Sequence, residues 1–175
     1  MKEAGWAVWI TGPPASGKSS VARFLKKKLT QIGVEAQILE SEIVSRVIAP
    51  NLTHSPEEQE KFHNALVYIG VLLTQNGVNV IFDATAHKRR WRRAARGLID
   101  KFLQAYIRCP FEVCRERDRN GTYGKDSTRE GYRTPDAQDE YEEPWHADIE
   151  LDCLRDSPEA SAEKIMEAMR INGFI

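Results

Sequence analysis

Residues 12–20 read GPPASGKSS, and they follow the apolar run AVWI at residues 7–10. The stretch fits the pattern GxxxxGK followed by Ser or Thr, with a predicted strand before it and a predicted helix after it. Glycines let such a loop curl until its N–H groups point at phosphate oxygens, and the helix dipole adds positive potential there. We therefore expect a nucleoside triphosphate to bind here. An ordinary glycine-containing turn is the alternative, and Gly17-Lys18-Ser19 in this setting speaks against it.

Each residue of this loop is expected to help hold the nucleotide. Lys18 should reach the outer phosphates, and Ser19 should place its hydroxyl on a Mg²⁺ ion that bridges them. The predicted nucleotide-binding residues are Gly12, Pro13, Pro14, Ala15, Ser16, Gly17, Lys18, Ser19 and Ser20. ATP and Mg²⁺ are the expected cofactors.

Apolar runs alternate with helical patterns along the rest of the chain. Strands are predicted at 7–10, 35–40, 78–83, 102–109 and 148–153, and helices at 21–33, from Ser55 to about 75, near 87–99, from 111 and from 157. Strands regularly separated by helices require parallel pairing with right-handed crossovers. The predicted fold class is therefore α/β, a three-layer α/β/α sandwich around a parallel sheet, as in P-loop kinases. The length of 175 residues fits one domain, residues 1–175.

Residues 120–145 depart from this pattern. They are polar, rich in turn-forming residues and poor in aliphatic side chains, so they cannot contribute much core. A loop of this length inside a compact domain is typically a lid or a binding loop. We expect a lid, which suits a small kinase that must exclude water, and the NKxD run of guanine-specific switches is absent.

The composition excludes several other classes of protein. A formal net charge of -1 argues against general nucleic-acid binding. No apolar run approaches the ~18 residues needed to cross a bilayer, so no membrane association is expected. The first residues show no secretory signal, which favours the cytoplasm. Cys109, Cys114 and Cys153 lack CxxC spacing, and we expect them to be reduced, half-buried packing residues.

Three further stretches follow one another in an order known from one family. They are VCRERD at 113–118 with Gly121, Tyr123 and Lys125, then Asp139, Tyr141, Glu142 and Pro144, and finally Leu151-Asp152, SPE at 157–159 and GFI at 173–175. Together with the phosphate loop they resemble the helix-into-lid segment, the lid closure and the ending of adenylylsulfate kinases. The similarity runs through nearly the whole chain.

This resemblance implies a phosphotransferase with an alcohol group as acceptor, acting in sulfate assimilation. It would transfer the γ-phosphoryl group of ATP to the 3′-hydroxyl of adenosine 5′-phosphosulfate, giving 3′-phosphoadenylylsulfate. Arg117 is then expected to bind the nucleotide and neutralise charge during transfer, and Cys153 to lie near the adenine with a steric role only. A homodimer is the oligomeric state that the family implies.

The sequence departs from the family where the acceptor should bind. An Asp-Gly-Asp-Asn run is replaced by Glu40-Ser41-Glu42-Ile43, and an expected arginine of the long helix meets Gln59 or Glu60. Lost cations weaken binding of a doubly charged phosphosulfate. Two alternatives therefore stay open: a kinase of the same build acting on a different nucleotide, sugar or antibiotic, and a non-catalytic nucleotide-binding regulatory module. Intact Lys18 and Ser19 favour an enzyme.

Two carboxylates are the candidate catalytic acids. Asp83 ends the strand VIFD, at the carboxyl edge where ligands bind in parallel sheets. It is expected to hold Mg²⁺ through water or to accept the acceptor's proton, and capping the next helix with Thr85 is the structural alternative. Glu42 is expected to orient the acceptor hydroxyl or the metal. The predicted catalytic residues are Lys18, Glu42, Asp83 and Arg117, and the metal-binding residues are Ser19, Glu42 and Asp83.

The remaining candidates concern the small-molecule acceptor. The basic run HKRRWRRAAR at 87–96 places Arg89 and Arg90 nearest the strand end, where they can contact an anion. The distal arginines of this run are expected to form a solvated helix face that pairs with acids. Tyr132 is a candidate for stacking on an aromatic acceptor. The predicted acceptor-binding residues are Glu40, Glu42, Arg46, Arg89, Arg90, Lys125 and Tyr132.

Overall fold

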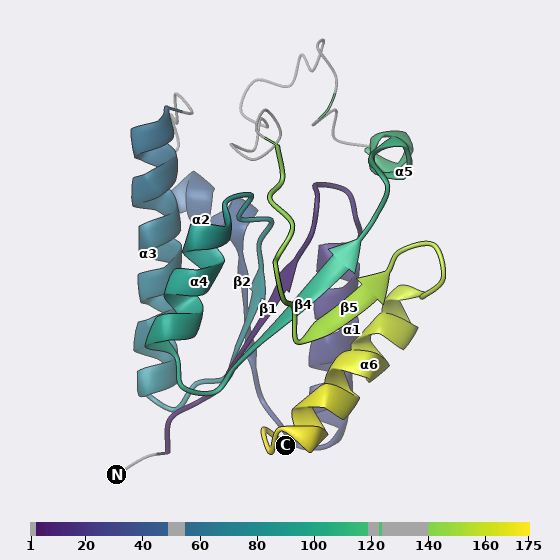
Figure 1. The fold of residues 1–175 in the computed structure, drawn as a ribbon. Coiled ribbons are helices and arrows are strands. Elements are labelled where there is room, and N and C mark those ends of the chain that lie inside the picture. The colour runs from purple at the N-terminus through teal and green to yellow at the C-terminus, as the bar shows by residue number, and fades with distance from the viewer. Residues whose placement is uncertain (1–2, 49–54, 119–122, 124–139) are drawn as a thin grey trace.

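The computed structural model describes residues 3–48, 55–118, 123 and 140–175. Strands and helices alternate through these ranges (Figure 1). The strands are β1 (Ala7–Thr11), β2 (Gln37–Glu40), β3 (Val80–Asp83), β4 (Phe102–Arg108) and β5 (Ile149–Asp152). The helices are α1 (Lys18–Gln31), α2 (Ser41–Ile48), α3 (Pro56–Gln75), α4 (Arg89–Leu98), α5 (Phe111–Arg117) and α6 (Pro158–Ile171).

The described strands form one parallel sheet in the order β2-β3-β1-β4-β5. The chain fills the side of β3 and β2 first and then crosses to β4 and β5, so the order reverses at β1. Ligands bind at such a reversal, outside the carboxyl ends of the strands. The predicted strand segments and the parallel α/β fold are confirmed.

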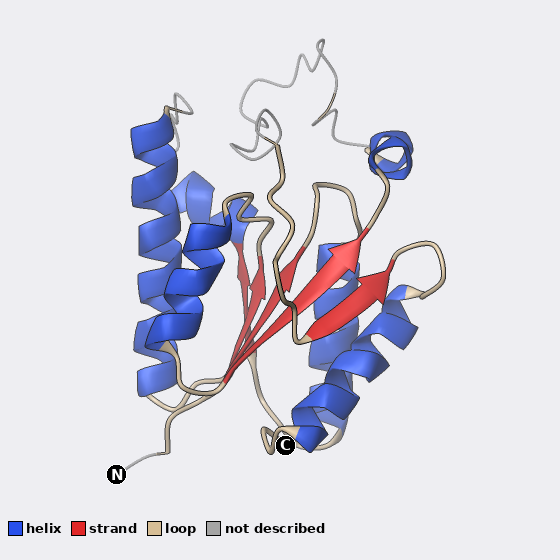
Figure 2. Cartoon of the chain, in the orientation of Figure 1, coloured by secondary structure: helices blue, strands red, loops and turns tan. Residues whose placement is uncertain are grey.

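Helices cover both faces of this sheet, with α3 and α4 on one side and α1 and α6 on the other (Figure 2). Alternate residues of β1 pack on opposite faces of the sheet, because successive strand side chains point in opposite directions. Val8 and Ile10 pack in the cluster with α1 and α6, and Trp9 packs with Phe82 in the cluster with α3 and α4. Two apolar cores thus hold one sheet.

Serine side chains cap the N-termini of α3 and α6. Ser55 accepts a hydrogen bond from the Glu58 N–H at 3.3 Å, and Ser157 accepts one from the Ala160 N–H at 3.1 Å. The suggested cap at α4 is wrong: Lys88 holds that position without a side-chain bond, while Asp83 ends β3. None of the helices in the described ranges has the length and apolarity to cross a membrane.

Gly70 of α3 packs closely against Phe82 of the sheet. A Cβ at this position would lie 2.1 Å from Cζ of Phe82, whose ring is fully buried and stacked on Trp9 with 4.3 Å between ring centroids. Gly70→Ala should therefore lower the free energy of unfolding by about 2 kcal/mol, because overpacking outweighs the gain in helix propensity. Urea unfolding measures this.

Gly97 in α4 is the matched control, since no atom lies within 4 Å of a Cβ built there. Gly97→Ala should stabilise the protein by about 0.5 kcal/mol through helix propensity alone. Equal effects of the two substitutions would contradict the packing of Gly70 against Phe82.

Candidate functional site

The loop between β1 and α1 curls tightly at the point where the strand order reverses. Gly12 and Gly17 adopt φ angles of 155° and 102°, and Ala15 adopts 59°. A Cβ at Gly12 would lie 2.7 Å from the Ile107 carbonyl oxygen of β4, so only glycine fits this close approach. The Ser16 N–H donates to the Pro13 carbonyl at 3.2 Å and closes the turn. The backbone therefore has the conformation that a phosphate loop requires.

Lys18 lies over this loop as the first residue of α1. Its ammonium donates to the carbonyl oxygens of Gly12 and Pro13 at 3.1 and 2.9 Å, and the residue is only 9% exposed. A buried ammonium is costly unless it is hydrogen-bonded. The loop thus holds a positive charge at the place where the sequence predicts the outer phosphates.

Two tyrosines from the predicted lid segment contact the loop and the end of the strand before it. The Tyr123 hydroxyl donates to the Pro14 carbonyl at 2.9 Å, and the Tyr141 hydroxyl shares a hydrogen bond of 2.9 Å with Thr11 Oγ1. Burial raises the pKa of the Tyr123 phenol above its ordinary value, so it remains a neutral donor. The sequence motifs include both tyrosines, but the motifs do not indicate which groups the two side chains contact.

Asp83 lies beside the loop at the carboxyl edge of the sheet. It stands opposite Ile10 in β1 and Glu40 in β2, and it is 6% exposed. Within the described ranges no hydrogen bond reaches its carboxylate. Asp83 therefore lies at the carboxyl edge of the sheet, and its role toward the metal or the acceptor stays a prediction.

The donor set fits a magnesium ion. Ser19 and Asp83 supply hydroxyl and carboxylate oxygens, which Mg²⁺ prefers, and Mg²⁺ usually keeps several waters and binds substrate phosphates. In the part of the chain that the structure describes, no group of three or more His, Cys, Asp or Glu side chains could hold a metal alone. Ser19 and Asp83 would therefore share such an ion with the phosphates of the nucleotide.

Glu42 and Arg46 lie together on α2. Their charged groups are 4.0 Å apart, and both side chains are about half exposed. Glu40, the last residue of β2, is partly buried beside Asp83. The second strand and the helix after it thus bring two predicted acids and one predicted cation to the same edge.

The two predicted arginines at the start of α4 face different neighbours. Arg89 donates to the Glu143 carbonyl at 2.8 Å and lies 3.6 Å from the Glu142 carboxylate. Arg90 pairs instead with Glu60 of α3, at 2.5 Å. The structure therefore separates two side chains that the sequence grouped together.

The expectation of a solvated distal face on this helix is wrong for Arg92. This residue is 1% exposed, and its guanidinium donates to the carbonyl oxygens of Ala86 and Glu142. It joins α4 to the chain that leads into β5, and a one-helix pattern cannot reveal a partner 50 residues away.

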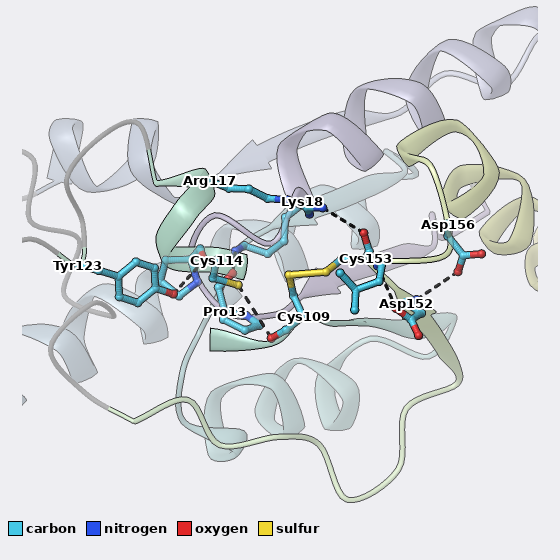
Figure 3. Close-up of a disulfide and its surroundings, with 11 residues drawn as sticks. Pro13, Lys18, Cys109, Cys114, Arg117, Tyr123, Asp152, Cys153 and Asp156 are labelled. Atoms are coloured by element: carbon cyan, nitrogen blue, oxygen red, sulfur yellow. Dashed lines mark hydrogen bonds between the residues drawn. A yellow bond between two sulfur atoms is a disulfide. The ribbon is translucent and has the colours of Figure 1, made fainter. Parts of the chain in front are cut away.

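Arg117 of α5 and Cys153, the residue after β5, are hydrogen-bonded neighbours (Figure 3). The Arg117 guanidinium donates to the Cys153 carbonyl at 3.2 Å, at the carboxyl end of β5. Two residues that the family resemblance assigned to the nucleotide are therefore neighbours. Lys125 and Tyr132 lie outside the described residues.

The expectation of three reduced cysteines is wrong, because Cys109 and Cys153 form a disulfide with 5.3 Å between their Cα atoms. The Cys153 N–H also donates to the Arg108 carbonyl at 3.1 Å, so the ends of β4 and β5 are already adjacent. Cys114 is the buried free thiol, and its Sγ lies 3.9 Å from the Cys109 carbonyl. Cys153 thus has a covalent role beyond the steric one expected.

Reducing this disulfide should destabilise the protein. Closure of a loop with a sequence separation of 44 residues restricts the unfolded chain by up to about 4 kcal/mol. Urea unfolding with and without reductant should show this loss in the wild type and in Cys114→Ser, and no response in Cys153→Ser. Three alkylated thiols in the oxidised, denatured protein would contradict the pairing.

Comparisons with known proteins agree on one family. The sequence model described as adenylylsulphate kinase matches residues 4–152. A probable adenylyl-sulfate kinase of Pyrococcus abyssi is 32% identical over 171 residues, 98% of each chain, and one of Archaeoglobus fulgidus is 36% identical over 147 residues, 84% of this chain and 95% of that one. The solved Mycobacterium tuberculosis APS kinase in complex with AMPPNP and APS matches with a TM-score of 0.82 at 26% identity, covering 96% of this chain and 99% of the other. This chain belongs to the adenylylsulfate kinase family.

Proposed function

We propose that this protein transfers the γ-phosphoryl group of ATP to the 3′-hydroxyl of adenosine 5′-phosphosulfate, giving ADP and 3′-phosphoadenylylsulfate. The observation that carries the proposal is the Lys18 ammonium, held over a curled phosphate loop in a chain of this family. In the reaction the bond from the γ-phosphorus to the bridging oxygen breaks, and a bond to the acceptor oxygen forms. Such transfer is accelerated mainly by positioning and by charge stabilisation.

Different residues around the loop would stabilise the phosphates, hold the metal and accept the proton. Lys18 stabilises the outer phosphates, and Arg117 adds a second positive charge from α5. Asp83 and Ser19 would hold Mg²⁺, which neutralises phosphate charge when it is bound. Asp83 or Glu42 accepts the proton of the acceptor hydroxyl as the new bond forms.

Residues 120–145 would close over both substrates as a lid on a single domain spanning residues 1–175. The contacts of Tyr123 with Pro14 in the phosphate loop and of Tyr141 with Thr11 at the end of β1 support this role, because both tyrosines lie at the strand-loop junction where the nucleotide is expected. Lys125 and Tyr132 stay proposed acceptor contacts within the lid.

A second candidate is a kinase of the same build with a less anionic hydroxyl acceptor. Glu60 favours it, since this acid is one of the two residues, Gln59 or Glu60, that stand where the resemblance expects an arginine. Its carboxylate accepts from Arg90 and from Trp91 Nε1. A negative charge there opposes a phosphosulfate dianion, while the Arg90 it holds partly offsets that effect.

One assay separates these candidates. Purified protein is given ATP and Mg²⁺ with adenosine 5′-phosphosulfate or with a panel of nucleotides, sugars and antibiotics, and ADP release is measured. The proposal predicts the highest kcat/KM with adenosine 5′-phosphosulfate. A better acceptor in the panel would favour the second candidate, and tight ATP binding without ADP release from any acceptor would indicate a regulatory module.

We further propose that the protein acts in the cytoplasm, where ATP is plentiful, and as a homodimer. Light scattering of the purified protein tests the oligomeric state, and a monomer at assay concentrations would contradict it.

A further inference from the structure

A cavity of about 320 Å³ lies apart from the phosphate loop, between α4 and the chain that leads into β5. In Figure 1 this chain descends past α4 before it enters β5. Two hydrogen bonds join this chain to β4. The Gln104 N–H donates to the Asp148 carboxylate at 2.6 Å, and the Asp148 N–H donates to the Gln104 carbonyl at 3.0 Å. No residue of the phosphate loop lines this cavity.

The cavity is strongly positive. Its lining includes four arginines of α4, Arg89, Arg92, Arg93 and Arg96, and one carboxylate, Asp148. Residues spaced three and four apart lie on the same helix face, where like charges repel one another. The helix therefore holds more positive charge on this face than the lining neutralises.

The carboxylates near the cavity, Asp148 and Glu142, already bind other groups. Asp148 binds Arg96 in addition to the Gln104 N–H. Glu142 accepts the Arg89 N–H at 2.9 Å and lies within 3.7 Å of Lys88. This backbone bond and the surrounding cations hold the pKa of Glu142 below its ordinary range, so it is ionised and engaged at neutral pH.

Arg93 and Gln104 provide donors on the cavity wall. Arg93 is exposed and lies over the Trp145 ring, 5.4 Å from its centroid, and in the described part of the chain no carboxylate pairs with it. Gln104 is 4% exposed, and within the same ranges its side-chain nitrogen has no acceptor. A buried donor without a partner destabilises the fold, so an acceptor is expected to fill this place.

Trp145 gives the cavity a flat wall. It is 67% exposed, and the guanidinium groups of Arg89 and Arg93 both lie over its ring, at 4.8 and 5.4 Å from the centroid. The two cations repel each other, and the Glu142 carboxylate offsets the charge of Arg89, while an anion bound beside Arg93 would offset the other. Planar guanidinium groups match the oxygens of phosphate and sulfate groups, which they bind in a bidentate manner.

We propose that this cavity binds a phosphate or sulfate group, free or carried on a nucleotide, through Arg93 and the Gln104 side-chain amide. No residue of the phosphate loop lines this cavity, and its test is a binding measurement that does not depend on turnover.

The test is calorimetric titration of the full-length protein with its phosphate loop filled by saturating ADP and Mg²⁺. The probes are inorganic sulfate, inorganic phosphate and adenosine 5′-phosphosulfate, each at constant ionic strength with chloride as the competing ion. Arg93→Gln should weaken binding at least tenfold, whereas Arg23→Gln, the same change on an exposed residue of α1, should leave it unchanged. Binding of the free ions that Arg93→Gln weakens assigns the free ion. Binding of the nucleotide assigns the carried group only where Arg93→Gln weakens it, because the nucleotide also occupies the acceptor site of the proposed reaction.

An NMR titration of the same ADP-filled protein locates the site. The indole N–H of Trp145 and the side-chain amide of Gln104 should shift with the anion, while the indoles of Trp6 and Trp9 should not. If no probe binds in a way that Arg93→Gln weakens, or if neither Trp145 nor Gln104 shifts, the proposal is overturned and water is the partner of Gln104.

Discussion

Lys18→Ala should lower kcat at least 100-fold with ATP, Mg²⁺ and the preferred acceptor. The ammonium lies 3.1 and 2.9 Å from two carbonyl oxygens of the phosphate loop, within reach of a γ-phosphate placed there. Removal of one preorganised charge from a phosphoryl-transfer site typically costs about 3 kcal/mol of transition-state stabilisation. Initial rates of ADP release at saturating substrates measure the loss.

Lys27 provides the matched control, because it is an exposed lysine on the same helix. Lys27→Ala should retain wild-type kcat, and circular dichroism should show that both variants keep the fold. Wild-type turnover in Lys18→Ala would remove the basis for the proposed transfer reaction.

Asp83→Asn is expected to lower kcat about 100-fold, the effect of losing one charged group from the reacting centre. The substitution keeps the shape of a residue that is 6% exposed and removes its charge, so a loss of rate reports the carboxylate and not its packing. α4 is capped at Lys88, which removes helix capping as an explanation for such a loss.

The dependence of kcat on Mg²⁺ concentration identifies the role of Asp83. Partial recovery at high Mg²⁺ would assign the carboxylate to the metal, and a constant deficit would assign it to the acceptor proton. Asp100→Asn, an exposed residue of the turn before β4, should behave as wild type. Unchanged kcat in Asp83→Asn would exclude both roles.

Contacts between α3 and α4 bear on the arginine that the acceptor region lacks. Glu60 holds Arg90 from α4 and also accepts from Trp91. An arginine therefore stands near the position that lost one, but it comes from another helix. The sequence could show the loss, whereas only the packing of α3 against α4 shows the replacement.

The sequence by itself determined the strands, the capped helices and the phosphate loop. Each of these depends on residues a few positions apart, such as the alternation of β1, the cap of Ser55 on Glu58, and glycines at positive φ. Short-range backbone preferences and burial periodicity are enough to specify such features.

Only the tertiary structure decided which distant side chains meet. Cys109 pairs with Cys153 because β4 and β5 are parallel neighbours, and Arg92 is buried because the chain before β5 passes over α4. The cavity beside α4 has the same origin, since its walls come from segments about 50 residues apart. Such contacts depend on strand order and helix packing, which periodicity within one segment does not encode.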